Sequence, residues 1–430
     1  MTEVNASIIT IGDELLIGQT IDTNSAFIAQ ELNKIGVWVR RRVAIADDKE
    51  AILKTLASES KEADIIIVTG GLGPTADDIT KPALCEYFNS KLVVDKTTLE
   101  NVTEIFKKLG RQLSDRNASQ AEVPDNCSVL PNLRGTAPGM WFTKDDVVYV
   151  SLPGVPHEMK GLTTHSVIPK IKESFSLSAV VHRTLLTAGQ GESQIADRLI
   201  EFEAGLPSYI KLAYLPAYGM VRLRLTGRSD ETKKLDEEVA RHFEKLKSIV
   251  NEWLVADEDI TLQEAVSKLL KEKKKTLATA ESCTGGYIAH LITSMAGSSG
   301  IYNGGVVAYA YAAKEDILDV RSETLLQVGA VSEETVIQMA MGACSKMKTD
   351  YALATSGIMG PGGGTPEKPV GTVWIAVVDK NGKVKAQKFH FRFDRSRNIE
   401  LAAHSALNML RKFVLEDLTP TLSGKAGEGA

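Results

Sequence analysis

The 430-residue sequence has few cysteines, no long apolar run and no excess of basic residues. The four cysteines, Cys85, Cys127, Cys283 and Cys344, lie far apart and form no CxxC pair. This excludes a disulfide framework and a cysteine-ligated zinc site, and it is typical of a reducing cytoplasm. No apolar run is long enough for a membrane-spanning helix. The first residues include acids and no basic segment, unlike a secretory signal, so we expect a cytoplasmic protein.

The chain also lacks a basic charge balance. Lys and Arg total 50 against 55 Asp and Glu, which gives a formal net charge of −5. Because nucleic acids and anionic membranes are bound through basic surfaces, this balance disfavours both as partners. The composition is otherwise that of a globular protein, with 43% hydrophobic and 24% charged residues, and at roughly 150 residues per domain the length predicts about three domains.

Short apolar segments alternate with amphipathic segments in the first and last thirds of the chain. Strands are predicted at Ser7–Ile11, Ile65–Val68 and Val147–Leu152, with a helix that begins at Asn24 as its N-cap. This alternation predicts doubly wound sheets whose ligands lie beyond the carboxyl ends of the strands. We therefore predict an α/β fold with two doubly wound domains, 1–170 and 257–418, a small β-α-β-β-α domain between them, 171–256, and a disordered tail, 419–430.

A first candidate site combines glycines and acids at the strand ends of the first domain. Gly12-Asp13-Glu14 follows one strand, GGLGPTADDIT (70–80) follows a second, and Pro153-Gly154 follows a third. Glycines there let backbone amides approach a phosphate, and paired acids can hold a hard divalent cation. The segments contain neither the GK[ST] of a P-loop nor the GxGxxG of a dinucleotide-binding turn. A tight strand–helix turn with a capping aspartate is the alternative interpretation.

A second candidate site is the strand-to-helix turn AESCTGG (280–286). Ser282, Cys283 and Thr284 are adjacent potential nucleophiles, and backbone amides near 284–286 could stabilise an oxyanion. A buried Cys283 that only fills space in the core is the alternative for the thiol.

A base for this nucleophile is expected from the next strand end, where Tyr309 and Lys314 flank a turn. A desolvated lysine can accept a proton from serine, whereas a solvated lysine at a helix start would have no such role.

A third candidate is the glycine-rich segment Gly360–Thr365, between two predicted strands. Glycines at this density suggest backbone amides arranged around an anion, with a flexible linker as the alternative. Arg395 and Arg397 follow the last predicted strand, and either could hold a phosphate or simply begin a helix as solvated charges.

Taken together, these motifs resemble the CinA (competence/damage-inducible) family. GDELLIGQTIDTNS, VTGGLGPTADDIT and SLPGVPHEM resemble its amino-terminal domain, which is related to molybdopterin-binding domains. AESCTGG, GGVVAYAYAAK and TSGIMGPGGGTPEKPVGTVW resemble its carboxy-terminal amidohydrolase domain. The middle segment is similar to the family's KH-like module but has no basic GxxG clamp for RNA, so a structural role is expected.

The resemblance implies two hydrolytic activities on fragments of NAD. The carboxy-terminal domain would convert nicotinamide mononucleotide to nicotinate mononucleotide and ammonia without a cofactor. The amino-terminal domain would hydrolyse ADP-ribose to AMP and ribose 5-phosphate with a divalent metal such as Mg, Co or Mn. A homodimer is also expected. Two alternatives stay open: a non-catalytic first domain that senses a nucleotide or a pterin, and an interaction factor in competence or DNA damage.

The resemblance also implies roles for individual residues. Ser282 would attack the carboxamide, Lys314 would take its proton and Tyr309 would position or relay it, with Cys283 and Thr284 as further catalytic candidates. The expected metal ligands are Asp13, Glu14, Asp77 and Asp78, of which Asp78 aligns best. The residues expected to bind substrate are Gly285, Gly286, Gly360, Gly362, Gly363, Gly364, Thr365, Arg395, Arg397, Gly70, Gly71, Gly73, Asn24, Pro153 and Gly154. The family usually has Gly-Asp-Arg where this chain has Phe393-Asp394-Arg395; Arg395 aligns with its phosphate-binding arginine, and Arg397 could substitute for it.

Overall fold

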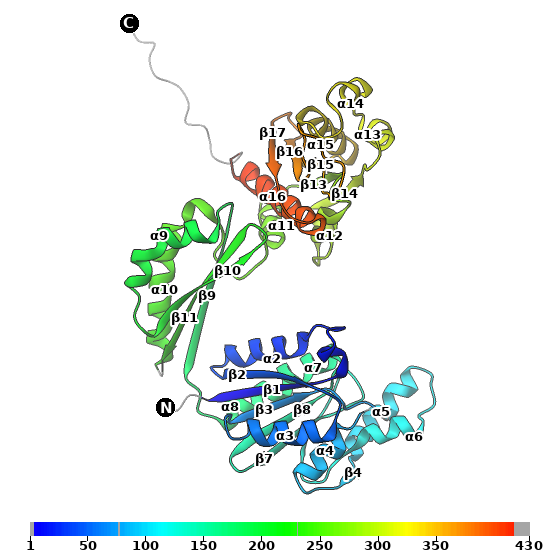
Figure 1. Cartoon of the computed structure of the whole chain (residues 1–430), viewed down its shortest axis with the longest axis vertical. Helices are drawn as coiled ribbons and strands as arrows, with labels where there is room; N and C mark the ends of the chain where they lie inside the picture. Colours follow the sequence, from blue (N-terminus) through cyan, green and yellow to red (C-terminus); the bar gives the residue numbers. More distant parts are fainter. Residues whose placement is uncertain (1–3, 76–77, 230, 417–430) are drawn as a thin grey trace. The chain divides into compact units, whose positions relative to one another are not determined.

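The computed structural model describes residues 4–75, 78–229 and 231–416 (Figure 1). The chain divides into two compact units, the first made of residues up to 182 with 227–238, and the second of 183–226 with the residues from 239 onward. Asp77 and the predicted tail, 419–430, lie outside the described residues. None of the described helices combines the length and the apolar character that crossing a lipid bilayer requires.

The first unit is built around a six-stranded sheet with the strand order β2-β1-β3-β8-β7-β6. The first four strands in this order are parallel to one another, and the last two are antiparallel. The strands are β1 (Asn5–Ile11), β2 (Trp38–Ile45), β3 (Ile65–Thr69), β6 (Ser128–Leu130), β7 (Gly139–Lys144) and β8 (Val147–Leu152). A separate antiparallel pair is formed by β4 (Leu92–Val94) and β5 (Glu122–Pro124).

Helices cover both faces of this sheet, because successive residues of the central strands are apolar on both sides. In β1, Ile8 packs into one core cluster and Ile9 into another. The helices of the first cluster are α2 (Thr23–Lys34), α7 (Pro156–Leu162) and α8 (Ile168–Ser174), and those of the second are α3 (Lys49–Glu59) and α4 (Thr80–Tyr87). The remaining helices are α1 (Asp13–Leu16), α5 (Lys96–Lys108), α6 (Asp115–Ala118) and the short η1 (Ser119–Ala121) and η2 (Thr163–Val167).

The start of α2 differs from the sequence-based prediction. Its N-cap is Asp22, whose side chain accepts a hydrogen bond from the Ser25 amide at 2.9 Å. Asn24 therefore lies inside the first turn, and its side chain is directed elsewhere. An aspartate is as good an N-cap as an asparagine, and Asp22 is further held by the hydroxyl of Thr10 at 2.9 Å.

The middle segment forms a four-stranded sheet with the order β10-β11-β9-β12. It contains the predicted β-α-β-β-α series and one additional short strand at the end. The elements are β9 (Ala179–Ala188), α9 (Glu192–Ala204), β10 (Ile210–Ala217), β11 (Met220–Ser229), α10 (Thr232–Ile249), η3 (Asn251–Trp253) and β12 (Leu254–Ala256).

The carboxy-terminal sheet has the order β14-β13-β15-β16-β17, in which the first three strands are parallel and the last two antiparallel. The strands are β13 (Leu277–Glu281), β14 (Tyr302–Val307), β15 (Tyr351–Gly357), β16 (Thr372–Asp379) and β17 (Val384–His390). One face is covered by α11 (Leu262–Lys273), α12 (Tyr287–Thr293) and α16 (Arg395–Glu416), and the other by α13 (Tyr311–Leu318), α14 (Ser322–Val328) and α15 (Glu333–Met347). A short η4 (Ser298–Gly300) precedes β14. The predicted α/β fold with helices on both faces is thus confirmed for both larger domains.

Candidate active sites

Ser282 lies in the turn between β13 and α12, and a buried carboxylate holds that turn in place. Glu281, the last residue of β13, is 1% exposed. Its carboxylate accepts hydrogen bonds from the amides of Gly286, Ile288 and Ala289 at 3.1, 3.0 and 2.8 Å. These are amides at the start of α12 that have no partner inside the helix. Glu281 was not among the predicted site residues, although an acid directly before a turn into a helix is a signal for such a cap.

Lys314 is the side chain that faces the Ser282 hydroxyl. Its Nζ lies 3.1 Å from Ser282 Oγ, and it donates hydrogen bonds to the carbonyls of Ala308 at 2.6 Å and Tyr309 at 3.3 Å. Lys314 is 1% exposed, and no carboxylate of the described residues lies within ion-pair distance of it. Burial lowers the pKa of Lys314 below its ordinary value, because an apolar environment disfavours the charged form.

The position of α13 explains why this lysine is buried. The sequence left open a solvated lysine at a helix start, whereas α13 begins before Lys314, at Tyr311. Lys314 therefore lies in the first turn, on the side that packs toward α15 and the sheet, and not at an exposed helix start. The solvated interpretation of this lysine is wrong.

The two neighbours of Ser282 lack a comparable base. The Cys283 thiol is buried, and burial raises its pKa to about 12, so little thiolate is present at neutral pH. The Thr284 hydroxyl bonds to Glu281 Oε2 at 2.7 Å and to Thr355 Oγ1 at 2.8 Å. Of the three adjacent candidates, Ser282 is the one that contacts Lys314.

Of the oxyanion amides predicted near 284–286, two have partners within the protein, and the Cys283 amide, which was not predicted, joins the third. The Gly285 amide donates to the Ser282 carbonyl at 3.2 Å and the Gly286 amide donates to Glu281, so both are already engaged. The amides of Cys283 and Thr284 donate to no other residue in the described part of the chain. They are the donors of this turn that remain open to a ligand oxygen.

Arg395 contacts both the glycine-rich segment and Tyr309, whose backbone carbonyl accepts a hydrogen bond from Lys314. Its Nη1 donates to the Gly360 carbonyl at 2.8 Å, and its Nη2 lies 3.3 Å from the Tyr309 hydroxyl. Arg397 instead lies over the Phe393 ring, with its guanidinium carbon 4.1 Å from the ring centre. The Tyr309 ring is thus placed beside Arg395, while its backbone carbonyl contacts Lys314. The structure brings Arg395 to the glycine-rich segment and leaves Arg397 away from it.

The glycine-rich segment is fastened at its far end. The Thr365 amide donates to the Lys368 carbonyl at 3.0 Å, and Lys368 Nζ donates to the Val328 carbonyl at 2.6 Å. At Gly364 a Cβ atom would lie 2.7 Å from the Val370 amide nitrogen, so a side chain there would clash. Gly362 and Gly363 are exposed; a Cβ atom on Gly362 would have no atom within 4 Å, and one on Gly363 would lie 3.7 Å from Ile358 Cγ2. These contacts do not fit a flexible linker.

In the first unit, the predicted phosphate-binding glycines meet at one edge of the sheet. Gly70 has a φ of 119°, and a Cβ atom there would lie 2.3 Å from the Ile11 carbonyl oxygen. A Cβ atom on Gly71 would lie 2.2 Å from Thr80 Oγ1, and one on Gly154 would lie 3.4 Å from the Gly70 Cα atom. The ends of β1, β3 and β8 therefore approach one another closely, and the backbone is exposed to a ligand without intervening side chains.

Asn24 reaches this edge from α2. Its Nδ2 donates to the Gly154 carbonyl at 2.7 Å and lies 3.3 Å from Thr69 Oγ1. Its Oδ1 atom is buried without a hydrogen-bond partner among the described residues. Because buried polar atoms nearly always have partners, this oxygen is an acceptor that a bound ligand could satisfy.

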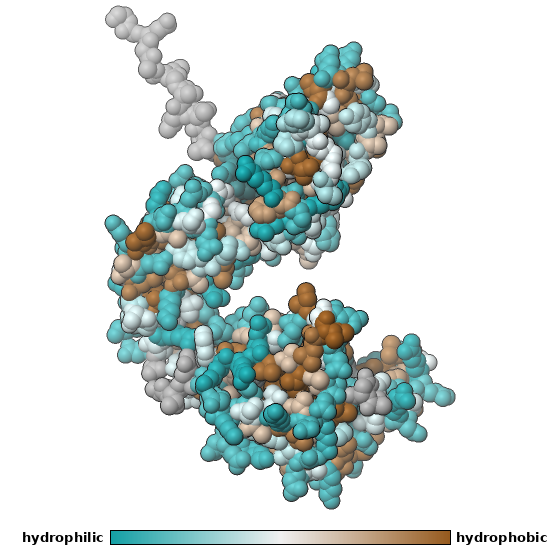
Figure 2. Space-filling view, viewed as in Figure 1, coloured by the Kyte–Doolittle hydropathy of each residue, from teal (hydrophilic) through white to brown (hydrophobic). Residues whose placement is uncertain are grey.

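Exposed apolar side chains adjoin the same strand ends. Leu16, Ile17 and Ile21, which follow β1, are 53%, 75% and 84% exposed, and Figure 2 shows apolar surface on this part of the first unit. Such side chains beside a polar cradle are suited to the ring of a ligand.

The predicted metal ligands do not form a cluster within the described residues. The Asp78 carboxylate accepts hydrogen bonds from the amides of Gly73 and Thr75, both at 2.8 Å, and from the Thr75 hydroxyl. The Asp13 carboxylate accepts from the Asp47 amide at 3.3 Å. Over residues 4–75, 78–229 and 231–416, no three His, Cys, Asp or Glu side chains are grouped as a metal site would require. The residues that the structure describes therefore do not fit a divalent metal by themselves.

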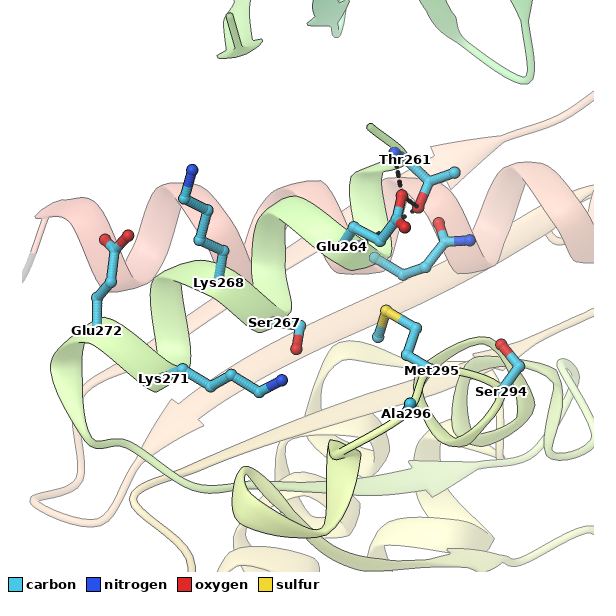
Figure 3. Close-up of a pocket in the computed structure, with 10 residues that line it drawn as sticks. Thr261, Glu264, Ser267, Lys268, Lys271, Glu272, Ser294, Met295 and Ala296 are labelled. Carbon is cyan, nitrogen blue, oxygen red and sulfur yellow. Dashed lines mark hydrogen bonds between the residues drawn. The ribbon is translucent and has the colours of Figure 1, made fainter. Parts of the chain in front are cut away.

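A pocket of about 720 Å³ lies elsewhere in the second unit, between α11 and the end of α12 (Figure 3). Lys271, Ser294 and Met295 are among its lining residues, and none of the predicted site residues is. Neither Ser282 nor Arg395 lines this open pocket, so we do not include the pocket in the candidate site.

Comparison with known proteins covers nearly the whole chain. Family models match residues 7–173 ("Probable molybdopterin binding domain"), 182–256 ("Damage-inducible protein CinA KH domain") and 259–414 ("CinA C-terminal domain"). A "CinA-like protein" from Cytophaga hutchinsonii is 46% identical over 415 residues, which cover 96% of this chain and 99% of that protein. One from Flavobacterium psychrophilum is 46% identical over 416 residues, with the same two coverages. The crystal structure of the competence/damage inducible protein CihA from Agrobacterium tumefaciens is 40% identical, covers 35% of this chain and 92% of that chain, and has a TM-score of 0.35.

Proposed function

The chain belongs to the CinA family, and from this premise we propose that its carboxy-terminal domain is a Ser–Lys amidase that deamidates nicotinamide mononucleotide. The observation that carries the proposal is the buried contact between Lys314 Nζ and Ser282 Oγ. The choice of substrate rests on the family resemblance, and the anion-binding character of the Arg395 region supports it.

The burial of Lys314 without a counter-charge favours a neutral amine, and its contacts can accommodate one. A neutral amine has two N–H groups and one lone pair. The carbonyls of Ala308 and Tyr309 accept the two N–H groups, which leaves the lone pair for the Ser282 hydroxyl proton. A protonated lysine has three donors and no lone pair, and here it would be buried without a counter-charge. Lys314 is therefore suited to be the general base.

In the proposed reaction, Ser282 Oγ attacks the carboxamide carbon while its proton moves to Lys314 Nζ. The carbonyl oxygen becomes an oxyanion that the amides of Cys283 and Thr284 stabilise. Lys314 then returns the proton to the leaving nitrogen, the C–N bond breaks, and ammonia departs from an ester on Ser282. Water attacks this ester with Lys314 again as the base, which releases nicotinate mononucleotide and the free serine.

The substrate phosphate is proposed to bind at Arg395 and the open amides of Gly362 and Gly363. Arg395 is already oriented by the Gly360 carbonyl and by the Tyr309 hydroxyl, so it loses little freedom when it binds an anion. Arg397 has no such placement, and we assign the phosphate to Arg395.

The substrate assignment is tested by comparing two amides that differ in their phosphate. Ammonia release is measured with nicotinamide mononucleotide and with the corresponding riboside, on the wild type and on Arg395→Ala. We expect turnover of the nucleotide, a KM for the riboside at least ~10-fold higher, and loss of this preference in Arg395→Ala. The matched control is Arg397→Ala, which should keep the preference. Absence of any ammonia release from the nucleotide would contradict the proposed activity.

For the amino-terminal domain, we propose hydrolysis of ADP-ribose to AMP and ribose 5-phosphate, the reaction that the family resemblance implies. The glycine edge formed by Gly70, Gly71 and Gly154 supports a bound diphosphate, the unpaired Asn24 Oδ1 offers an acceptor, and the adjacent apolar side chains suit the adenine ring. The metal requirement is a separate proposal that rests on the resemblance alone, because the described carboxylates are not grouped.

The proposed hydrolysis of ADP-ribose and its proposed metal requirement are tested on the same protein preparation. AMP formation from ADP-ribose is followed with added Mg, Mn or Co and after chelation. Activity that disappears on chelation and returns with one metal would support the metal proposal, and activity that persists would contradict it. Binding of ADP-ribose without turnover under all conditions would favour the sensor alternative.

A further inference from the structure

A second pocket of about 330 Å³ lies within the second unit, away from Ser282 and Arg395. The turn after β9, at Gly189, and the β10–β11 turn, at Tyr218, form one side of it. Helix α16 forms the other side with His404, Asn408 and Lys412. No residue assigned to the proposed reactions lines this pocket.

The base of this pocket is part of the protein core. Ala188, Met220 and Met409 line it and are 2%, 7% and 5% exposed. All three belong to the hydrophobic cluster that also contains α11 and the carboxy-terminal sheet. Because one continuous core supports both sides, the walls of the pocket are fixed relative to each other.

Two nitrogen donors of α16 face the space that Gly189 leaves open. A Cβ atom on Gly189 would lie 3.8 Å from Asn408 Nδ2 and 3.9 Å from Lys412 Nζ. The two residues are four positions apart, so their side chains project from the same face of the helix. Neither nitrogen donates to an acceptor in the described part of the chain.

Arg411 fixes the orientation of the Asn408 amide. This arginine is 7% exposed, and its Nε and Nη2 both donate to Asn408 Oδ1 at 3.2 Å. With the oxygen held on that side, the amide NH₂ group is directed away from Arg411. The donor is therefore pre-oriented before any ligand binds.

His404 adds an acceptor and a flat wall. It is 9% exposed, its Nδ1 donates to the Glu400 carbonyl at 2.7 Å, and its ring stacks on Tyr218 with centres 5.5 Å apart and an interplanar angle of 4°. Burial lowers the pKa of His404, so the ring is neutral at and above neutral pH. Since Nδ1 carries the proton, Nε2 is an acceptor, which suits a hydroxyl group of a ligand.

The charge of the lining is positive. Lys385 and Lys412 line the pocket, and no carboxylate does. Lys385 is paired with Glu416 at 2.7 Å, whereas no ion pair of Lys412 is found among the described residues. One cation and one oriented amide thus converge on a small space, the arrangement by which proteins bind a phosphate group.

We propose that this pocket binds a small phosphomonoester, with its phosphate on Asn408 Nδ2 and Lys412 Nζ and a hydroxyl of its organic part on His404 Nε2. The volume admits a sugar phosphate but is at the lower limit for a full nucleotide. The site is distinct from both proposed reaction sites.

The test uses a readout local to the pocket, because phosphate also has other candidate sites in this chain. The full chain is labelled with ¹⁵N at its seven histidines, and the His404 ring signal is identified by its loss in His404→Gln. Ribose 5-phosphate and inorganic phosphate are titrated separately at constant pH and ionic strength. We expect a saturable shift of the His404 signal. Lys412→Gln should weaken the apparent affinity about tenfold, and Lys388→Gln, an exposed lysine outside the lining, should leave it unchanged.

Tighter binding of ribose 5-phosphate than of phosphate would support a sugar phosphate site with the hydroxyl on His404, and equal binding would support a site for the phosphate group alone. No saturable shift with either probe would overturn the proposal. The proposal is also overturned if Lys412→Gln binds as tightly as the wild type.

Discussion

At the residue scale, the proposed deamidation depends on one lysine, Lys314, whose environment the sequence could only partly predict. The spacing of Tyr309 and Lys314 after a strand indicated a base. The same sequence is compatible with a solvated lysine, since the burial of Lys314 depends on where α13 begins. In the structure two backbone carbonyls, of Ala308 and Tyr309, complete the lysine's surroundings. Every residue has a backbone carbonyl, so the residue types do not indicate which carbonyls will accept a hydrogen bond. This part of the site therefore could not have been predicted from the sequence.

Because the pKa of Lys314 is lowered, replacing this lysine by an apolar residue should decrease activity and increase stability. Because the folded protein binds this proton less tightly than the unfolded chain, stability increases with pH between the folded-state pKa and the ordinary value of 10.5. Lys314→Met should therefore resist urea better than the wild type, by a margin that grows as the pH is lowered from 10 toward 7. The same variant should lose deamidation by ~10²–10⁴-fold.

Urea unfolding across this pH range and ammonia release measure the two effects. Lys388→Met is the control, because its side chain is exposed, and it should change neither quantity. A variant Lys314→Met whose stability relative to the wild type does not change between pH 10 and pH 7 would contradict a lowered pKa of Lys314 in the folded state.

At the element scale, the patterns predicted the central strands and most helices, and the errors were at the ends. Asn24 was predicted as an N-cap, but Asp22 caps α2, and the Asn24 side chain instead donates a hydrogen bond to the Gly154 carbonyl after β8. The antiparallel strands β6 and β7 were not predicted. The edge strand β6 has three residues, which is too few for an alternating pattern to be visible. The close approach of the three strand ends could be predicted, because the carboxyl ends of parallel strands lie at the same edge of a sheet. The hydrogen bonds between the Asp78 carboxylate and amides of its own loop could not be predicted.

The close approach of strand ends makes Gly70 sensitive to any side chain. Gly70→Ala combines an unfavourable φ of 119° with a contact of 2.3 Å to the Ile11 carbonyl. We expect a loss of at least ~2 kcal/mol in the free energy of unfolding. Gly18→Ala is the matched control, since its φ of 74° is also positive but no atom lies within 4 Å of the added Cβ. Its expected loss is about 1 kcal/mol. Equal losses in urea titrations would refute the close approach.

At the scale of the whole molecule, the structure shows the expected fold class, in which two α/β domains are joined along the chain by a smaller β-α-β-β-α segment. The two α/β domains have separate cores and belong to different compact units. The net charge of −5 gives no support to nucleic-acid binding, whereas backbone N–H groups and single arginines supply a local positive potential where phosphates are expected. The total charge of a chain says little about such local sites.

Separate cores predict that the two activities can be lost independently. Asn24→Ala should reduce ADP-ribose hydrolysis or binding by ~10-fold through loss of the oriented amide and leave deamidation unchanged. Ser282→Ala should do the reverse. Both reactions are measured on each variant, and a substitution in one domain that changes kcat in the other would contradict independence.

Ammonia release from nicotinamide mononucleotide in Ser282→Ala and Cys283→Ala decides whether Ser282 or its neighbour Cys283 is the nucleophile. With Ser282 as the nucleophile, we expect a loss on the order of 10³-fold or more in Ser282→Ala and activity near that of the wild type in Cys283→Ala. Retained activity in Ser282→Ala together with loss in Cys283→Ala would contradict this assignment.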